Sequence, residues 1–401
     1  MSELSYMEKL LDGVEVEWRT IGEVSLRTSN IKWREVTRSY RYIDLTSVDI
    51  ETKKITETAK ITADNAPSRA QKLLEENDVI FATTRPTQLR FCLIDDEYSG
   101  EVASTGYCVL RAKQDEILPR WILHWISTSD FKKYVEEHQS GSAYPAISDA
   151  KVKECLIPIP CPDNPEKSLA IQSEIVRILD KFTALTAELT AELTAELTAR
   201  KKQYNHYRDK LLSFDEGEVE WKTLGEVAKI TIGEFVRKDK QNPEAEYPVY
   251  NGGRTPTGYY EDFNNDGDKI IVSARGANAG YVNKSSTPYW AGNSCYSISV
   301  RVVKQLHWMY VYYYLKQSEA QLTGIQQKGG IPAVSKKQME DFLLPIPSPS
   351  EQARIVTILD KFDALTNSIT EGLPREIELR QKQYEHYRDL LFSFPKPDAV
   401  S

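Results

Sequence analysis

The first half of the sequence contains a segment in which cations alternate with aromatic rings. Residues 29–42 read SNIKWREVTRSYRY, and residues 27–60 hold eight basic against five acidic residues. Cations gathered on one face bind phosphates, and long polar side chains reach base edges in a groove. The residues of this half best suited to such contacts are Lys32, Arg34, Arg38, Arg41, Arg85, Gln88 and Arg90.

The second half offers side chains of the same kinds. When FATTRPTQLRF, from Phe81, is aligned with IVSARGANAGY, from Ile271, Arg85 lies beside Arg275 and Gln88 beside Asn278. Glycines adjoin two more cations, Arg254 and Lys328, and would let the backbone approach DNA closely. The candidates of this half are Arg254, Arg275, Asn278 and Lys328. Any one of the eleven residues could be an ordinary solvated side chain, but the set favours nucleic-acid binding.

Residue patterns for catalysis are missing from the sequence. It has no G-x-x-x-x-G-K-[ST] phosphate loop, and ARGANAG does not open a plausible crossover helix. The Asp/Asn-Pro-Pro-aromatic motif of adenine methyltransferases is absent. The five histidines lack metal-ligand spacing, and His206 and His386 are expected to pack or bond locally. We therefore expect no catalytic residue, no metal site and no cofactor.

Composition places the chain among ordinary globular proteins. It has 401 residues, 40% of them hydrophobic, which is enough for two or three domains. No apolar run approaches the roughly 20 residues that span a bilayer, and the N-terminus lacks a signal-peptide pattern, so we expect a cytoplasmic protein. Five scattered cysteines fit reduced packing thiols. The net charge of −8 excludes a uniformly basic coat but not a local basic face.

The second half of the chain repeats the first. IVRILDKFTALT begins at Ile175, and IVTILDKFDALT begins 180 residues later at Ile355. VEWRTIGEV, YPAISDAKVKECLIPIP and RKKQYNHYRDKLLSF also each have a second copy. Between these anchors lie two blocks of low mutual identity, 25–143 and 228–330, within which Trp121 is aligned with Trp308. A tandem duplication that carries two different surfaces indicates two different targets.

The repeated segments are predicted to be long helices, and the variable blocks to be mixed, β-rich domains. Asn164-Pro165 and Ser348-Pro349 are helix-start signals, the latter followed by a capping-box Glu351. Apolar residues then recur at heptad spacing in both copies, which favours antiparallel pairing of the two seams over burial of each in its own domain core. Gly372 and Pro374 predict a break in the second copy.

A tetrapeptide, Thr-Ala-Glu-Leu, occurs three times in succession from Thr186 to Leu197. Each copy adds about 6 Å of helix and rotates the downstream residues by about 40°. Leucine stays near the seam while the strict heptad drifts. The repeat is therefore interpreted as a spacer that sets a distance between flanking domains, although a low-complexity helix with no such role is the simpler alternative.

Two variable domains, two near-identical helical segments and TAEL repeats in the first of them resemble the DNA-specificity subunits of type I restriction-modification systems, most closely the type IC subfamily. The resemblance covers essentially the whole chain. It implies an α+β fold of two target recognition domains joined by two long conserved helices in an antiparallel coiled coil with pseudo-twofold symmetry. The implied divisions are 1–160 for an N-terminal arm and the first recognition domain, 161–215 for the central helical spacer with TAEL repeats, 216–347 for the second recognition domain and 348–401 for the C-terminal helical spacer.

The resemblance also implies a function in host defence. Each recognition domain would read one half of a split, asymmetric site in double-stranded DNA, and the helices would set the gap. Two modification subunits, adenine N6 methyltransferases, would dock on the helices, and ATP-dependent restriction subunits would join to cleave. The chain itself would be non-catalytic.

Two other functions stay open from the residues alone. A coiled-coil scaffold that binds proteins is disfavoured by the basic-aromatic segment, and a self-sufficient nuclease or methyltransferase is disfavoured by the missing motifs. The circular order of the repeats further predicts that the arm Met1–Arg19 packs near the C-terminal helix, with 16–24 and 219–227 at equivalent positions.

Overall fold

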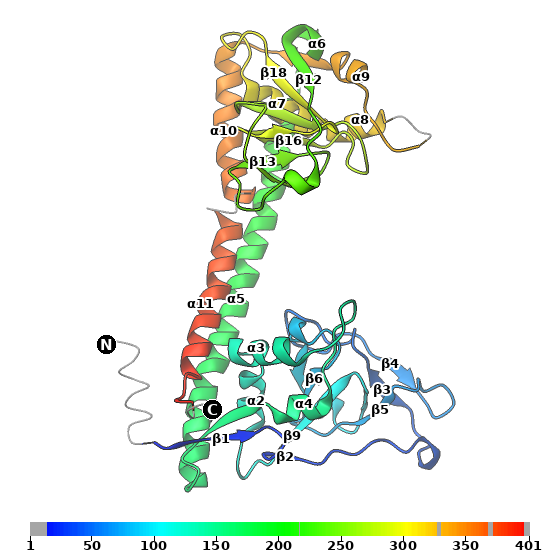
Figure 1. Cartoon of the computed structure of the whole chain (residues 1–401), viewed down its shortest axis with the longest axis vertical. Coiled ribbons are helices and arrows are strands. Elements are labelled where there is room, and N and C mark those ends of the chain that lie inside the picture. The colour runs from blue at the N-terminus through cyan, green and yellow to red at the C-terminus, as the bar shows by residue number, and fades with distance from the viewer. Residues whose placement is uncertain (1–13, 216, 327–329, 368–371, 397–401) are drawn as a thin grey trace. The chain divides into compact units, whose positions relative to one another are not determined.

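A computed structural model describes residues 14–215, 217–326, 330–367 and 372–396 (Figure 1). The chain forms two compact units, Met1–Ala191 with Glu378–Ser401, and Glu192–Ile377. Each unit combines small β-sheets with helices, so the fold is the α+β class predicted from the sequence. Within the described ranges, no helix is long and apolar enough to cross a membrane.

The first unit is built on three sheets. Its strands are β1 (Val16–Thr20), β2 (Ser25–Leu26), β3 (Tyr40–Ile43), β4 (Ala59–Ile61), β5 (Ala70–Leu73), β6 (Val79–Ala82), β7 (Phe91–Leu93), β8 (Val102–Ser104), β9 (Tyr107–Ala112) and β10 (Leu156–Pro160). The sheet orders are β2-β9-β6-β7, β4-β3-β8-β5 and β1-β10. Its helices are α2 (Pro119–Trp125), α3 (Ser129–His138), α4 (Asp149–Glu154), the start of α5 (Pro165–Leu211) and most of α11 (Leu373–Leu391).

The second unit repeats this plan. Its strands are β11 (Glu220–Thr223), β12 (Ala228–Ile232), β13 (Tyr247–Tyr250), β14 (Gly258–Tyr260), β15 (Lys269–Ser273), β16 (Val282–Ser285), β17 (Trp290–Ala291), β18 (Cys295–Val300) and β19 (Leu343–Ile346). The sheet orders are β12-β18-β15-β16, β14-β13-β17 and β11-β19. Its helices are α6 (Leu224–Val227), α7 (Trp308–Gln317), α8 (Glu319–Gly324), α9 (Lys336–Glu340) and α10 (Pro349–Asn367). In both units the β-branched and aromatic runs form the strands, as expected from strand preferences.

Equivalent residues make equivalent contacts in the two units, which confirms the duplication. Trp18 pairs with Pro158 across β1 and β10, and Trp221 pairs with Pro345 across β11 and β19. Directly after these strands the Ile21 amide donates to the Cys155 carbonyl at 2.9 Å, and the Leu224 amide to the Phe342 carbonyl at 2.8 Å. The stretches 16–24 and 219–227 thus hold the equivalent positions that the repeat order predicts.

A buried glutamine fastens each long helix to its domain. Gln172 accepts a hydrogen bond from the Leu118 amide at 2.9 Å and donates to the Glu116 carbonyl at 3.1 Å. Gln352 accepts from the His307 amide at 2.8 Å and donates to the Gln305 carbonyl at 3.0 Å. Both glutamine side chains are fully buried. Each glutamine thus pairs with the amide of the residue that caps α2 or α7, which no bond within that helix satisfies.

The same geometry corrects one sequence alignment. The Trp121 indole donates to the Pro158 carbonyl at 3.0 Å, and the Tyr310 hydroxyl donates to the Pro345 carbonyl at 3.0 Å. Trp121 is therefore equivalent to Tyr310, and its predicted alignment with Trp308 was wrong by two residues. The sequence alignment matched two tryptophans. The buried position needs only a large ring with one hydrogen-bond donor, which tyrosine also supplies.

A second polar contact joins each domain to its helix. His124 lies 2.8 Å from Asp180, and the Tyr313 hydroxyl donates to Asp360 at 2.5 Å. Burial raises the pKa of Asp180, but the hydrogen bond to His124 and the charges of His124 and Arg120 outweigh it and lower the pKa. The first unit thus uses an ionisable partner where the second uses a phenol.

The long helices form and pair as predicted. Helix α5 is 47 residues long and is capped by Asn164, whose side chain accepts from the Lys167 amide at 3.0 Å. In the first unit, the Phe182 ring of α5 lies 5.8 Å from the Tyr387 ring of α11, and Thr183 hydrogen-bonds to Tyr384 at 2.9 Å, so these helices run antiparallel. In the second unit, Tyr207 of α5 stacks on Phe362 of α10 at 5.7 Å. Figure 1 shows each pair side by side.

The predicted break in the second seam is confirmed. Helix α10 ends at Asn367, and α11 begins at Leu373. Gly372 has a φ of +84°, and a Cβ at this position would lie 2.5 Å from the Ala364 carbonyl oxygen. Glycine is the residue that accepts this conformation and this approach. At the start of α10 the Ser348 hydroxyl accepts a hydrogen bond from the Glu351 amide at 3.3 Å. The Glu351 carboxylate, which was predicted to complete a capping box, pairs with Arg354 at 2.6 Å.

The segment that follows α11 completes the core of the first unit. Phe392 lies 4.7 Å from the Trp121 ring, and the Trp18 indole donates to the Pro395 carbonyl at 2.7 Å. The arm was predicted to pack near the C-terminal helix, and this is confirmed for its residues 14–19, which include most of β1. Residues 1–13 lie outside the described part of the chain.

The glutamine contact yields a test of the fold. Gln172→Leu leaves the Leu118 amide and the Glu116 carbonyl without this buried partner, so we expect unfolding of the first unit to become easier by about 2–4 kcal/mol. The exposed neighbour Ser173 provides a control on the same helix, and Ser173→Leu should change stability by less than about 0.5 kcal/mol. Urea unfolding, followed by hydrogen exchange of β9 and α2 amides, measures both; equal effects of the two variants would contradict the role of Gln172.

Candidate nucleic-acid interface

Three loops meet in the first unit and form what we name the first loop cluster: residues 44–58, 83–90 and 139–147. The Arg85 amide donates to the Pro145 carbonyl at 2.7 Å, and the Ile147 amide donates to the Thr83 carbonyl at 2.9 Å. From the loop 44–58, Val48 accepts a hydrogen bond from the Arg90 guanidinium at 2.7 Å. Hydrogen bonds from backbone and side chains thus hold three loops, which are far apart in sequence, together as one surface.

The second loop cluster comprises residues 250–257, 274–281 and 330–334 and is held in the same way. The Gly276 amide donates to the Pro332 carbonyl at 2.9 Å, and the Val334 amide donates to the Ala274 carbonyl at 2.9 Å. Asn278 accepts from Arg254 at 3.3 Å and donates to the Gly252 carbonyl at 3.4 Å. Three of the four candidates in the second half, Arg254, Arg275 and Asn278, are therefore brought together.

The turns at the centre of the clusters correct a second alignment. Arg85 and Leu89 have φ of +50° and +47°, and Gly276 and Gly280 have φ of +99° and +87°. Matching these left-handed positions makes Arg85 equivalent to Gly276, one residue away from the predicted Arg275. The isolated bridges Thr84–Ala146 and Arg275–Ala333 agree with this register.

The correction has a physical cause and a consequence. Sequence comparison aligned identical arginines, but a turn is defined by its backbone, in which non-glycine residues with positive φ are uncommon. In the corrected register Gln88 is equivalent to Ala279, and Asn278 is equivalent to Thr87. The two clusters thus share a backbone while their polar side chains project from different positions.

Three predicted cations of the first half, the exposed Arg38 among them, bond to other groups of their own domain. Arg38 donates to the Gly100 carbonyl and stacks 3.8 Å from the Tyr40 ring. Arg41 pairs with Glu97 at 2.7 Å; this hydrogen bond raises the pKa of Arg41 despite partial burial, with help from the charge of Glu101. Arg90 donates to the Val48 carbonyl and holds the first loop cluster together. These three side chains organise the fold, which the sequence alone did not show.

The other candidates that the structure describes are not all in one place. Arg85, Gln88, Arg254 and Arg275 are exposed in the loop clusters, and Asn278 is half-buried. Lys32 and Arg34 are exposed on the segment that follows β2, with Lys32 3.4 Å from Glu35. That segment is held on β5 by the Trp33 indole, which donates to the Ala70 carbonyl at 2.8 Å. Lys328 lies outside the described residues.

The structure adds candidates that sequence reasoning missed. Exposed Arg237, Lys238 and Lys240 follow β12, just as Lys32 and Arg34 follow β2. The segment also carries Phe235, which is 66% exposed. Continuing the alignment from VEWKTLGEV past the last identical residue would have found them, because β2 and β12 occupy the same edge of their sheets.

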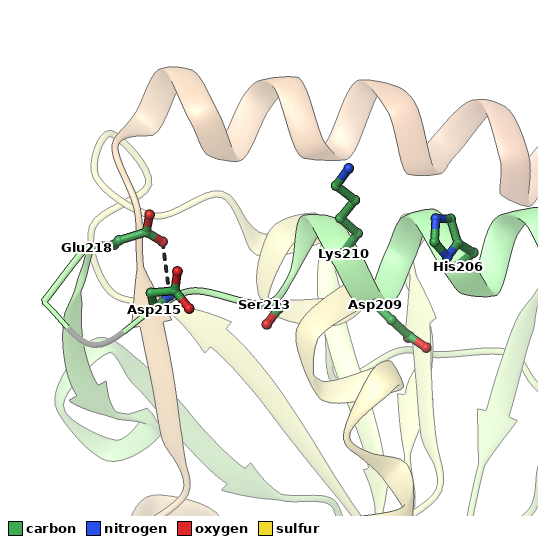
Figure 2. A pocket seen from close by; sticks show the side chains of 6 residues that line it. All are labelled: His206, Asp209, Lys210, Ser213, Asp215 and Glu218. Carbon is green, nitrogen blue, oxygen red and sulfur yellow. Dashed lines mark hydrogen bonds between the residues drawn. The ribbon is translucent and has the colours of Figure 1, made fainter.

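One hollow at the end of α5 offers no catalytic arrangement. It is lined by His206, Asp209, Lys210, Ser213, Asp215 and Glu218. In Figure 2 Ser213 and His206 do not point toward one another, and the drawn hydrogen bond joins the Asp215 amide to Glu218 at 3.0 Å. A nucleophile needs a base within hydrogen-bond reach. The hollow is therefore a polar surface feature, and its three carboxylates disfavour a phosphate ligand.

The cysteines are packing residues. All five are free, and burial raises the pKa of Cys92, Cys108, Cys155 and Cys295 to about 12 in each case. Thiols of this kind are unreactive at neutral pH. Within the described ranges, no three His, Cys, Asp or Glu side chains gather in a way that could bind a metal ion.

A lysine supports the central turn of the first loop cluster from below. The Lys53 amine donates to the Leu89 carbonyl and lies 4.6 Å from the centre of the Phe91 ring. Burial lowers the pKa of Lys53 to about 8; Asp49 raises it, while Arg90 and Arg388 lower it further. The Lys53 amine thus holds Leu89, which has a left-handed backbone, in place. Burial of the charged amine lowers the stability of the fold.

This environment predicts a pH dependence. Between pH 8 and 10.5 the unfolded lysine keeps a proton that the folded one releases, so the stability of the first unit should rise with pH over this range. The free energy of unfolding of the unmodified chain, minus that of Lys53→Met, should therefore increase from pH 8 to 10.5, because the other titrating groups cancel. If urea titrations show the same difference in unfolding free energy at every pH, the lowered pKa of Lys53 is contradicted.

Comparison with known proteins agrees with this architecture. Residues 14–199 and 216–379 match the family model described as the type I restriction modification DNA specificity domain. The chain is 40% identical, over 427 aligned positions that cover 100% of both chains, to the Escherichia coli type I restriction enzyme EcoR124I/EcoR124II specificity subunit. It is 36% identical to the E. coli EcoprrI specificity subunit, with 92% of this chain and 93% of that one covered.

Solved structures show the same fold. A chain from a study of complex assembly and conformational transition in the type I R-M system has a TM-score of 0.69 at 24% identity and covers 94% of this chain and 97% of its own length. The HsdS subunit from Thermoanaerobacter tengcongensis has a TM-score of 0.54 at 24% identity, with 94% and 96% covered. The duplicated domains, the paired helices and these matches agree: the chain belongs to the family of DNA specificity subunits of type I restriction-modification systems.

Proposed function

We propose that this chain is the non-catalytic subunit that selects a split site in double-stranded DNA, with one half read by each loop cluster. The observation that carries the proposal is that two loop frames with equivalent backbone bonds present different polar side chains. Membership of a DNA specificity family gives the target class, and the two frames give the number of reading surfaces. The unequal side chains make the two halves different in sequence.

Base contacts are assigned to candidates of the two loop clusters, and phosphate contacts to the segments that follow β2 and β12. Arg85 and Gln88 would read bases of the first half, and Arg254, Arg275 and Asn278 bases of the second, because arginine and amide groups match base edges in the major groove. Lys32 and Arg34, with Lys238 and Lys240, would contact phosphates beside the two halves. Arg38, Arg41 and Arg90 would act indirectly by holding loops, and Lys328 adjoins the second cluster in sequence.

The TAEL segment would set the gap between the halves. It lies inside the single helix α5, where Leu189, Leu193 and Leu197 are half-buried while Glu188, Glu192 and Glu196 are exposed. Adding or removing one such unit moves the leucine by only about 40° around the helix, so a leucine seam and a charged outer face are kept. The helix can therefore change length without exposing its apolar side.

The wider assembly follows from the family. We propose recognition domains at 1–160 and 216–347 and helical spacers at 161–215 and 348–401, with the spacers docking two modification subunits. Those subunits would methylate adenine, and ATP-dependent restriction subunits would complete the complex in the cytoplasm. A pure protein-binding scaffold is the competing function, and it predicts no DNA sequence preference.

Deletion of one TAEL unit tests the spacer. Cells expressing the chain with its modification subunit should carry adenine methylation at a motif of two halves separated by unspecified bases. Removing Thr190–Leu193 shortens α5 by about 6 Å, and a base pair rises about 3.4 Å, so the gap should shorten by about one or two base pairs while both halves persist.

Sequencing of methylated adenines in both strains measures this. An unchanged gap would remove the spacing role and leave DNA recognition intact. Absence of any sequence-dependent methylation, with all subunits expressed, would favour the scaffold.

Half-specific variants test the two reading surfaces. Arg85→Ala with Gln88→Ala should relax preference at bases of the first half by about 1–3 kcal/mol per lost contact and leave the second half unchanged. Arg275→Ala should do the reverse. Arg34→Ala provides the contrast, since losing a phosphate contact should weaken all sequences similarly and reduce the salt slope by about one. Gel shifts with single-base variants of the mapped site measure these effects; loss of preference in both halves from either variant would contradict separate reading.

A further inference from the structure

An apolar side chain stands exposed at the same point of each loop cluster. Tyr144 is 73% exposed and Ile331 is 67% exposed. They begin the duplicated stretches YPAIS and IPAVS, so they are equivalent residues although one is aromatic and the other aliphatic. Isolated exposed apolar residues are common on protein surfaces, but a matched pair in two otherwise different loops needs a cause.

The backbone holds both residues beside the base-reading turns. Tyr144 precedes Pro145, whose carbonyl accepts from the Arg85 amide at 2.7 Å, and Ile331 precedes Pro332, whose carbonyl accepts from the Gly276 amide at 2.9 Å. The Arg85 guanidinium lies 5.4 Å from the Tyr144 ring. In the first loop cluster, Ser140 and Ala146 also exchange two hydrogen bonds of 2.9 Å, which closes a short hairpin around Tyr144. The apolar groups are therefore presented by fixed backbone next to exposed cations.

The surroundings select among possible occupants. A second apolar protein surface or a lipid tail would have to bury Arg85 or Arg275 along with the apolar group, which costs free energy without a partner charge. A duplex groove provides phosphates for the arginines and one apolar feature on its base edges, the C5 methyl of thymine. Of these occupants, only DNA satisfies both neighbours at once.

We propose that Tyr144 and Ile331 are specificity-determining residues, each making an apolar contact with the C5 methyl of a thymine in its own half-site. The inference rests on the proposed function and deepens it by naming the apolar part of the readout. It explains why the position stays apolar in both domains while its shape differs: the shape selects where along the groove the methyl must lie.

The test removes the methyl group from the DNA and the side chain from the protein. In the complex with its modification subunit, the chain is bound to duplexes carrying the mapped site, with deoxyuridine replacing each thymine in turn. One replacement in each half should weaken binding about fourfold, the value of one buried methyl group. Tyr144→Ala should abolish this sensitivity in the first half only, and Ile331→Ala in the second half only.

Conservative variants and folding controls complete the design. Tyr144→Phe and Ile331→Val keep an apolar contact and should keep the sensitivity to deoxyuridine, and unchanged thermal midpoints exclude misfolding. Three outcomes would overturn the inference while specific binding still supports the proposed function. The unmodified chain could bind thymine and deoxyuridine duplexes equally, a half-site could contain no thymine, or the alanine variants could retain the sensitivity. Absence of any preference for the mapped site would overturn both.

Discussion

The structure depends on a buried glutamine that fixes each long helix to its domain. Gln172 and Gln352 are fully buried, and each pairs with an amide and a carbonyl just before the domain helix α2 or α7. Because such a network stabilises only when all of its groups are paired, it specifies one register of helix against domain. Asp180 and Asp360 repeat this restraint two turns further along. The network therefore holds each domain at one position along its helix.

A fixed frame separates stability from specificity. The hydrogen bonds that assemble each loop cluster are mostly between backbone groups, which any sequence can make, and the exposed side chains contribute little to folding. The turn at Arg85 and Gly276 has the same left-handed backbone with a different residue on it. New polar side chains can therefore replace old ones without rebuilding the core. This is the physical reason that a duplicated chain can acquire two unrelated surfaces.

Much of the fold was predictable, because it is encoded in local and periodic patterns. Repeats, helix caps, the leucine seam and the break at Gly372 all depend on residues near one another in sequence. The site was less predictable. Arg38, Arg41 and Arg90 have cationic side chains suited to DNA, but their partners Gly100, Glu97 and Val48 are distant in sequence, and only tertiary structure brings them together. The predicted alignments of Arg85 with Arg275 and of Trp121 with Trp308 were wrong because they matched identical residues. The equivalent positions instead share a backbone angle in the first case and a hydrogen-bond donor in the second. Tyr144 was missed because exposure has no local signal, and the segment with Phe235 because the alignment ended at the last identical residue.

Two equivalent frames that read DNA independently can be exchanged for one another. The most direct measurement replaces residues 25–147 with residues 228–334, so that both frames carry the second surface with all of its loops, and maps adenine methylation in cells that contain the modification subunit. The account predicts a motif in which the second half-site occurs twice and the first is lost. Persistence of the original first half, or a motif unrelated to either half from a folded chimera, would contradict it.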